Sequence, residues 1–174
     1  MVLDRSVLPK RKRNRLGNFD YGQEGYYFIT LCTRNMRHIF EIEPVRNDLC
    51  VVPYDAAQTT VLQNRIIYKW IKETENKFPN IKFDKCVIMP NHLHFIIIIK
   101  ERHAGRSLPD IMRFFKTMTT NEYIRYIKEG KLPPLYKKLW QKSYYDHIIR
   151  NKDDYKEVWN YIENNPQKWL LKEE

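Results

Sequence analysis

Cysteine is scarce in this sequence, and neither a secretion signal nor a membrane span is evident. The three cysteines, Cys32, Cys50 and Cys86, are odd in number and widely spaced, which argues against a disulfide framework and a zinc knuckle. The longest apolar run, Phe95–Ile99, is far too short to cross a bilayer. Residues 1–15 are charged rather than apolar, unlike a signal peptide. We therefore expect a cytoplasmic protein that does not bind membranes.

Positive charge is in clear excess. The 174 residues include 31 Lys and Arg against 21 Asp and Glu, a formal net charge of +10. This excess favours polyanionic partners, with nucleic acid as the first candidate and an anionic membrane as the second. Residues 1–24 form a basic arm that is either a solvated tail or a phosphate-binding segment. Its candidate DNA-binding residues are Lys10, Arg11, Lys12, Arg13 and Arg15.

The rest of the chain has the composition and periodicity of one folded domain. Hydrophobic residues make up 43% of the sequence, which argues against disorder over most of its length. The patterns predict strands at 25–33, at 81–100 (interrupted by Pro90) and at 140–150, with a short strand near 49–52. They predict helices at 55–76, at 108–128 and from 153 or 154 onward. Pro166 is expected to break the last helix. The order predicts an α+β, ferredoxin-like fold with helices packed against a central antiparallel sheet.

The triplet His92-Leu93-His94 falls in a predicted strand. Residues i and i+2 of a strand point to the same face, so both imidazoles project together. Imidazole is a common ligand for divalent metals. Two histidines at this spacing are also compatible with an ordinary half-buried strand, so a site needs a third ligand and a reactive group.

Tyr161 and Asn165 offer that third ligand and that reactive group. They lie four residues apart in the last predicted helix and hence on one face, one turn apart. Asn supplies a carbonyl oxygen, and Tyr supplies a phenol, a nucleophile that requires activation. With His92 and His94, the set favours Mg²⁺ or Mn²⁺ over a closed zinc site. The alternatives are a core aromatic at Tyr161 and a helix-ending Asn before proline.

Four stretches together resemble the HUH single-tyrosine transposases, most of all their REP-associated tyrosine transposase branch (IS200-like). They are residues 27–30, residues 87–96 with a His-hydrophobe-His motif after Met-Pro-Asn, residues 140–150, and residues 161–166. The likeness covers about residues 22–168. The predicted organisation is a basic arm at 1–24, the transposase domain at 25–168 and a tail at 169–174.

The resemblance implies a role for each candidate residue. His92, His94 and Asn165 would bind the metal, and Tyr161 would attack single-stranded DNA to form a 5′-phosphotyrosine and release a 3′-hydroxyl. Such enzymes recognise hairpins formed by palindromic repeats, and they act as monomers or homodimers, with the tyrosine working in cis or in trans. Arg113 and Lys116 of the basic helix would then contact the hairpin or form a solvated face.

Several alternatives remain open on sequence alone. Tyr144 and Tyr145 lie beside His147 and compete with Tyr161 as the nucleophile. Arg150 suits a phosphate contact, but it suits a surface salt bridge equally well. A non-catalytic DNA- or RNA-binding domain of the same fold is the main competing function. A related replication or mobilisation nuclease is a third, although such chains are usually longer.

Overall fold

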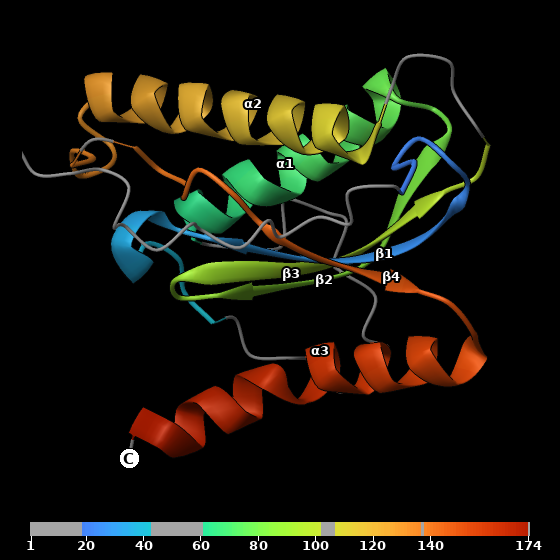
Figure 1. Cartoon of the computed structure of the whole chain (residues 1–174). Helices are drawn as coiled ribbons and strands as arrows, with labels where there is room; N and C mark the ends of the chain where they lie inside the picture. Colours follow the sequence, from blue (N-terminus) through green and yellow to red (C-terminus); the bar gives the residue numbers. More distant parts are fainter. Residues whose placement is uncertain (1–18, 43–60, 102–106, 137, 174) are drawn as a thin grey trace, which may run out of the picture.

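The structure, a computed structural model, describes residues 19–42, 61–101, 107–136 and 138–173. Its strands form one antiparallel sheet in the order β2-β3-β1-β4. Helices α1 and α2 cover one face of the sheet, and α3 lies across the other (Figure 1). The expected α+β, ferredoxin-like arrangement is confirmed. The elements are β1 (Gly25–Cys32), the short 3₁₀ helix η2 (Arg34–Met36), α1 (Leu62–Lys77), β2 (Ile81–Met89), β3 (His92–Ile99), α2 (Leu108–Lys128), β4 (Tyr145–Ile149) and α3 (Lys152–Glu173).

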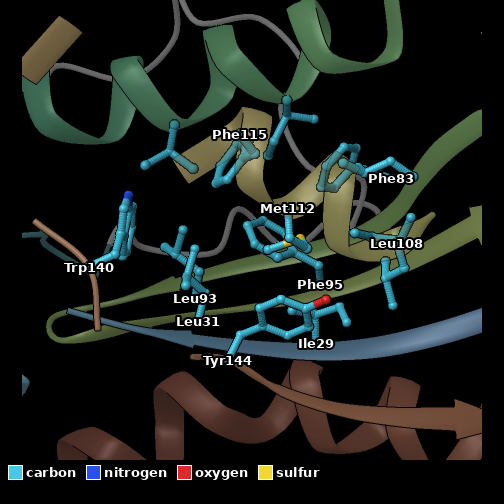
Figure 2. Packing of buried hydrophobic residues seen from close by; sticks show 14 of the residues in the cluster. Ile29, Leu31, Phe83, Leu93, Phe95, Leu108, Met112, Phe115, Trp140 and Tyr144 are labelled. Atoms are coloured by element: carbon cyan, nitrogen blue, oxygen red, sulfur yellow. The ribbon is translucent and has the colours of Figure 1, made fainter. Parts of the chain in front are cut away.

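Strand β3 shows how the sheet separates two cores. Its odd-numbered residues, including Leu93 and Phe95, are fully buried in a large cluster under α1 and α2 (Figure 2). Its even-numbered residues point toward α3, because successive side chains of a strand alternate between faces. On that side, a much smaller buried cluster attaches α3, made of Phe28, Ile96, Ile149, Val158 and Ile162.

Helix α2 begins and ends where its sequence signals predict. The carboxylate of Asp110 accepts hydrogen bonds from the backbone N–H and the hydroxyl of Ser107, at 3.0 and 2.7 Å, which satisfies groups that a helix start leaves unpaired. Gly130 follows the helix with a φ of +71°, a left-handed conformation that glycine adopts without steric cost. The predicted bounds at 108–128 are therefore confirmed.

Four predicted segments differ in extent from the structure or lie wholly or partly outside the described residues. Strand β4 is shorter than the predicted 140–150, because Trp140 pairs with Thr33 only through an isolated bridge. The Trp140 indole N–H instead donates to the hydroxyl of Thr119 on α2, which draws this residue into the large core. The predicted helix at 55–76 begins later, at Leu62, because the backbone of Val61 is extended. Residues 55–60, the short strand near 49–52 and residues 1–18 of the basic arm lie outside the described residues. The last part of the arm is described, and its Tyr21 is buried in the large core. None of the described helices is long and apolar enough to span a membrane.

The expected break of the last helix at Pro166 is wrong, because α3 continues through it to Glu173. A proline inside a helix lacks the N–H that would bond one turn back, which destabilises the helix by about 3 kcal/mol. Contacts beyond the proline offset this cost. Pro166 is itself buried, and Trp169, in the next turn, packs against His92 with ring centroids 5.8 Å apart.

A β-bulge on β2 provides further contacts to α3. The register shifts between Phe83 and Lys85, so that Asp84 and Lys85 both contact α3. The Tyr155 hydroxyl donates to Asp84, and the buried Lys85 ammonium lies 3.6 Å from a carboxylate oxygen of Glu163. Polar contacts along β2 thus supplement the small apolar cluster that holds α3.

Candidate functional site

His92 and His94 lie at the start of β3 on the face covered by α3. Their Nε2 atoms are 3.0 Å apart, and His94 is only 2% exposed. Two ligand atoms bound about 2.1 Å from one octahedral ion, at right angles to each other, are separated by about 3.0 Å. The spacing of the two nitrogens therefore matches that of adjacent ligands on a single divalent ion.

The other ring nitrogen of each histidine has a partner. The Nδ1 atom of His92 lies 2.6 Å from the side-chain oxygen of Asn91, and Nδ1 of His94 lies 2.9 Å from the hydroxyl of Thr30. An amide oxygen only accepts hydrogen bonds, so Nδ1 of His92 carries the proton and its Nε2 keeps a free lone pair. The Thr30 hydroxyl can donate or accept, so it can also stabilise the tautomer of His94 that leaves Nε2 free.

Both imidazoles are held in the neutral form that a metal requires. Burial lowers the pKa of His92 to about 4. Burial, together with the neighbouring His92, lowers the pKa of His94 to about 3. At neutral pH, each ring is therefore uncharged and has one nitrogen lone pair available for a metal.

Helix α3 brings Tyr161 and Asn165 to this pair. The ring centroids of Tyr161 and His94 are 5.2 Å apart, and the amide nitrogen of Asn165 lies 3.4 Å from Nε2 of His94. A half-turn of the Asn165 amide exchanges its nitrogen for the carbonyl oxygen, the atom that binds metals. Among the described residues, no group of three or more His, Cys, Asp or Glu could hold a metal.

The Tyr161 side chain is accessible but has a fixed neighbour. It is 45% exposed, and its ring meets that of Phe28 edge to face at 5.8 Å. Phe28 in turn stacks on His94 at 5.3 Å. The phenol therefore lies beside a histidine of its own chain, where a substrate can still reach it.

The competing tyrosines lie in different surroundings. Tyr144 is 6% exposed and belongs to the large core on the other side of the sheet (Figure 2). Tyr145 is 53% exposed, and its ring lies 6.4 Å from that of Phe28. Nε2 of His147 lies 2.9 Å from a carboxylate oxygen of Asp154. This histidine is therefore hydrogen-bonded to a carboxylate and not to the phenol of a neighbouring tyrosine.

The predicted DNA-binding residues are not gathered at the histidines. Arg113 and Lys116 belong to α2, on the opposite face of the sheet (Figure 1). Arg113 pairs with Asp110 at 2.5 Å, while the Lys116 ammonium donates to the backbone carbonyls of residues 141 and 142 at 2.7 and 3.0 Å. Arg150 is exposed just after β4. Residues 10–15 lie outside the described residues.

Sequence reasoning assigned no role to four neighbours of the site: Phe28, Thr30, Asn91 and Trp169. Thr30 and Asn91 lie inside the stretches that carry the family resemblance, but only the strand pairing shows that Thr30 faces His94. Trp169 follows Asn165 by four residues, a helical spacing that the expected break at Pro166 concealed.

Comparisons with known proteins identify the family and the fold of the chain. An uncharacterized protein from Haemophilus influenzae is 33% identical over 175 residues, which cover 91% of this chain and 89% of that protein. The solved structure of a REP-associated tyrosine transposase bound to a REP hairpin matches with a TM-score of 0.57 at 20% identity, over 91% of this chain and 74% of that one, and so shares the fold. The family described as "Transposase IS200 like" matches residues 23–165. The chain therefore belongs to the IS200-like transposase family.

Proposed function

We propose that this protein is a single-tyrosine transposase that nicks and rejoins single-stranded DNA through a 5′-phosphotyrosine, with Mg²⁺ or Mn²⁺. One observation carries the proposal. Tyr161 and Asn165, one turn apart on α3, both reach His94, which already lies 3.0 Å from His92. A candidate nucleophile and three candidate metal ligands, from the middle of the chain and from its last helix, thus meet in one place.

The donor set suits a metal that retains open positions for substrate. His92 and His94 offer two neutral nitrogens, and Asn165 offers an amide oxygen, with no thiolate among them. A bound divalent ion would polarise the scissile phosphate and stabilise the charge that develops on it. The protein's part is to hold the two rings at ligand spacing and to keep them unprotonated.

The covalent step uses Tyr161 alone. Its hydroxyl oxygen attacks the phosphorus of a phosphodiester, the bond from phosphorus to O3′ breaks, and the phenolic proton passes through water to the departing O3′. The products are a 5′-phosphotyrosine and a free 3′-hydroxyl. The reverse attack by a 3′-hydroxyl restores both the tyrosine and an intact strand, so rejoining needs no external energy. The contact with the same chain's His94 supports action in cis.

We propose hairpins formed by palindromic repeats as the substrate. The REP-associated transposase that shares this fold was solved with such a hairpin bound, and this chain has a net charge of +10. The residues at 1–24 are proposed as a DNA-binding arm and those at 25–168 as the catalytic domain. Arg113, Lys116 and Arg150 remain proposed phosphate contacts, although Lys116 also ties α2 to residues 141 and 142.

A non-catalytic base-stacking domain fits the structure less well. Such domains stack bases on aromatic residues that are exposed on an open sheet. In this fold, helices cover both faces of the sheet, and sheet aromatics such as Tyr27, Phe83 and Phe95 are fully buried. Two described sheet aromatics, Tyr26 and Tyr145, are exposed, at 43% and 53%, but they form no continuous aromatic surface across the sheet.

The test is a search for the covalent intermediate. Labelled hairpin oligonucleotides from the host's palindromic repeats are incubated with protein and Mn²⁺, and a protein–DNA adduct is sought on a denaturing gel. We expect Tyr161→Phe to abolish the adduct, and the matched control Tyr145→Phe, which alters an equally exposed tyrosine, to retain it. Equal adduct from Tyr161→Phe and wild type would refute the mechanism. If the wild-type protein binds the hairpins without cleaving them, the competing function, a non-catalytic nucleic-acid-binding domain, is favoured.

A further inference from the structure

Trp169 is the third member of a stripe on α3 that faces the histidine pair. Tyr161, Asn165 and Trp169 follow one another at intervals of four residues, so they lie on one side of the helix. Tyr161 and Asn165 contact His94, while Trp169 contacts His92, with ring centroids 5.8 Å apart and planes inclined by 53°. Every member of the stripe therefore touches the candidate site.

The indole lies between two histidines. Its other ring neighbour is His38, whose centroid is also 5.8 Å away. The segment that carries His38 is fastened to the turn before His92, because the backbone N–H groups of Ile39 and Phe40 both donate to the carbonyl of Pro90. Trp169 thus packs against a part of the chain that is itself fixed to the start of β3.

The stability of the fold does not account for an indole at this position. Its Nε1 atom is buried and has no hydrogen-bond partner among the described residues. An unpaired buried donor destabilises a protein by about 1–3 kcal/mol. This buried donor makes an indole an unfavourable choice for packing alone, which points to a role in the site.

The contact acts on the freedom of the His92 ring. Asn91 binds Nδ1 of that ring, and Nε2 lies beside His94, but these contacts act only at the ring's edge. The indole limits rotation of the imidazole out of this arrangement. A ligand that is already in position loses less entropy when it binds a metal, so its affinity is higher.

We propose that Trp169 is a positioning residue that holds the His92 imidazole in place for a divalent metal ion. The inference rests on the proposed function, since it assumes that His92 is a metal ligand. It goes beyond the family match, which ends at residue 165.

The experiment compares Mn²⁺ affinity across variants of the full chain without DNA, by electron paramagnetic resonance of the free ion. We expect Trp169→Ala to weaken Mn²⁺ binding about ten-fold, the usual effect of losing a residue that orients a ligand. Trp169→Phe keeps an aromatic ring and should recover most of the affinity. Trp159→Ala is the matched control. It removes an α3 tryptophan that packs on Lys85, away from the histidines, and should leave the affinity unchanged.

A second readout needs no metal. In nitrogen-correlated NMR spectra of the imidazole rings, Trp169→Ala should broaden or shift the His92 signals, while those of the distant His147 stay in place. Unchanged affinity and unchanged His92 signals would overturn the inference, as would an equal loss of affinity in Trp159→Ala. If wild type binds no Mn²⁺, or binds it equally well after His92→Ala, the proposed metal site fails instead. In that case, the NMR comparison still tests whether Trp169 restrains the His92 ring.

Discussion

Replacing Thr30 by valine removes one hydroxyl from the site and keeps the branched shape of the side chain. In the wild type, that hydroxyl lies 2.9 Å from Nδ1 of His94, a ring that is only 2% exposed. After the substitution, Nδ1 has no partner there, and the tautomer with a free Nε2 must bury an unpaired N–H. The substitution therefore penalises the tautomer of His94 that would bind the proposed metal.

Two general magnitudes bound the effect. Loss of a partner that orients a metal ligand lowers metal affinity by about 10–100-fold, or about 1.4–2.8 kcal/mol. An unpaired buried polar group destabilises the fold by about 1–3 kcal/mol. Thr30 is half-buried, so water can replace part of the lost hydrogen bond, and we expect about a ten-fold loss of affinity.

The assay is a Mn²⁺ titration combined with nicking rates measured at limiting and at saturating Mn²⁺. Thr30→Val should nick about ten-fold more slowly at limiting Mn²⁺ and recover at saturation. Thr30→Ser keeps the hydroxyl and should resemble wild type at both concentrations. If Thr30→Val binds Mn²⁺ as tightly as wild type, the assignment of His94 as a ligand oriented by Thr30 is refuted.

Two further predictions concern the elements that flank the site. Ile162→Ala, at a fully buried position of α3, should destabilise the docking of α3 by about 2–5 kcal/mol. The loss should appear as faster hydrogen exchange in α3 than in α1 and as a lower adduct yield. Ile67→Ala, fully buried on the other face of the sheet, should instead affect the whole domain. Asp110→Asn should lower the melting temperature at pH 7, and this difference should shrink as the pH falls below the ordinary carboxyl pKa. The backbone N–H and then the hydroxyl of Ser107 lower the pKa of Asp110, so its stabilisation is present above the ordinary carboxyl pKa and is lost as the pH falls through the lowered value. A stability difference that stays as large in strong acid as at pH 7 would contradict this.

Strong periodic patterns in the sequence predicted most of the fold. Pro90 cannot donate to a ladder, so it marked the turn between β2 and β3, and the alternation after it placed His92 and His94 on one face. Ser107 and Gly130 marked the two ends of α2. These features depend on neighbouring residues, which is why one sequence was enough to predict them.

Features that depend on tertiary contacts could not be predicted in the same way. Local geometry argues against a helix at Asn165 and Pro166, yet packing on β3 outweighs that preference and extends α3. The sequence pattern around Lys116 suggests a solvent-exposed cation on a basic helix. In the structure, its ammonium donates hydrogen bonds to two backbone carbonyls. The pairing of Thr30 with His94 requires the register of β1 against β3, which no local pattern specifies.

The two cores give the two halves of the site different stabilities. The histidines lie on β3, whose other face is anchored in the large cluster beneath α1 and α2. Tyr161 and Asn165 depend on α3, which is held by five buried apolar residues and the polar contacts of β2. Local unfolding begins where few buried contacts hold an element, so α3 should separate from the sheet before the histidine pair loses its geometry. Separation of α3 would therefore remove Tyr161, Asn165 and the Trp169 contact from the site together, while the two histidines would keep their spacing on β3.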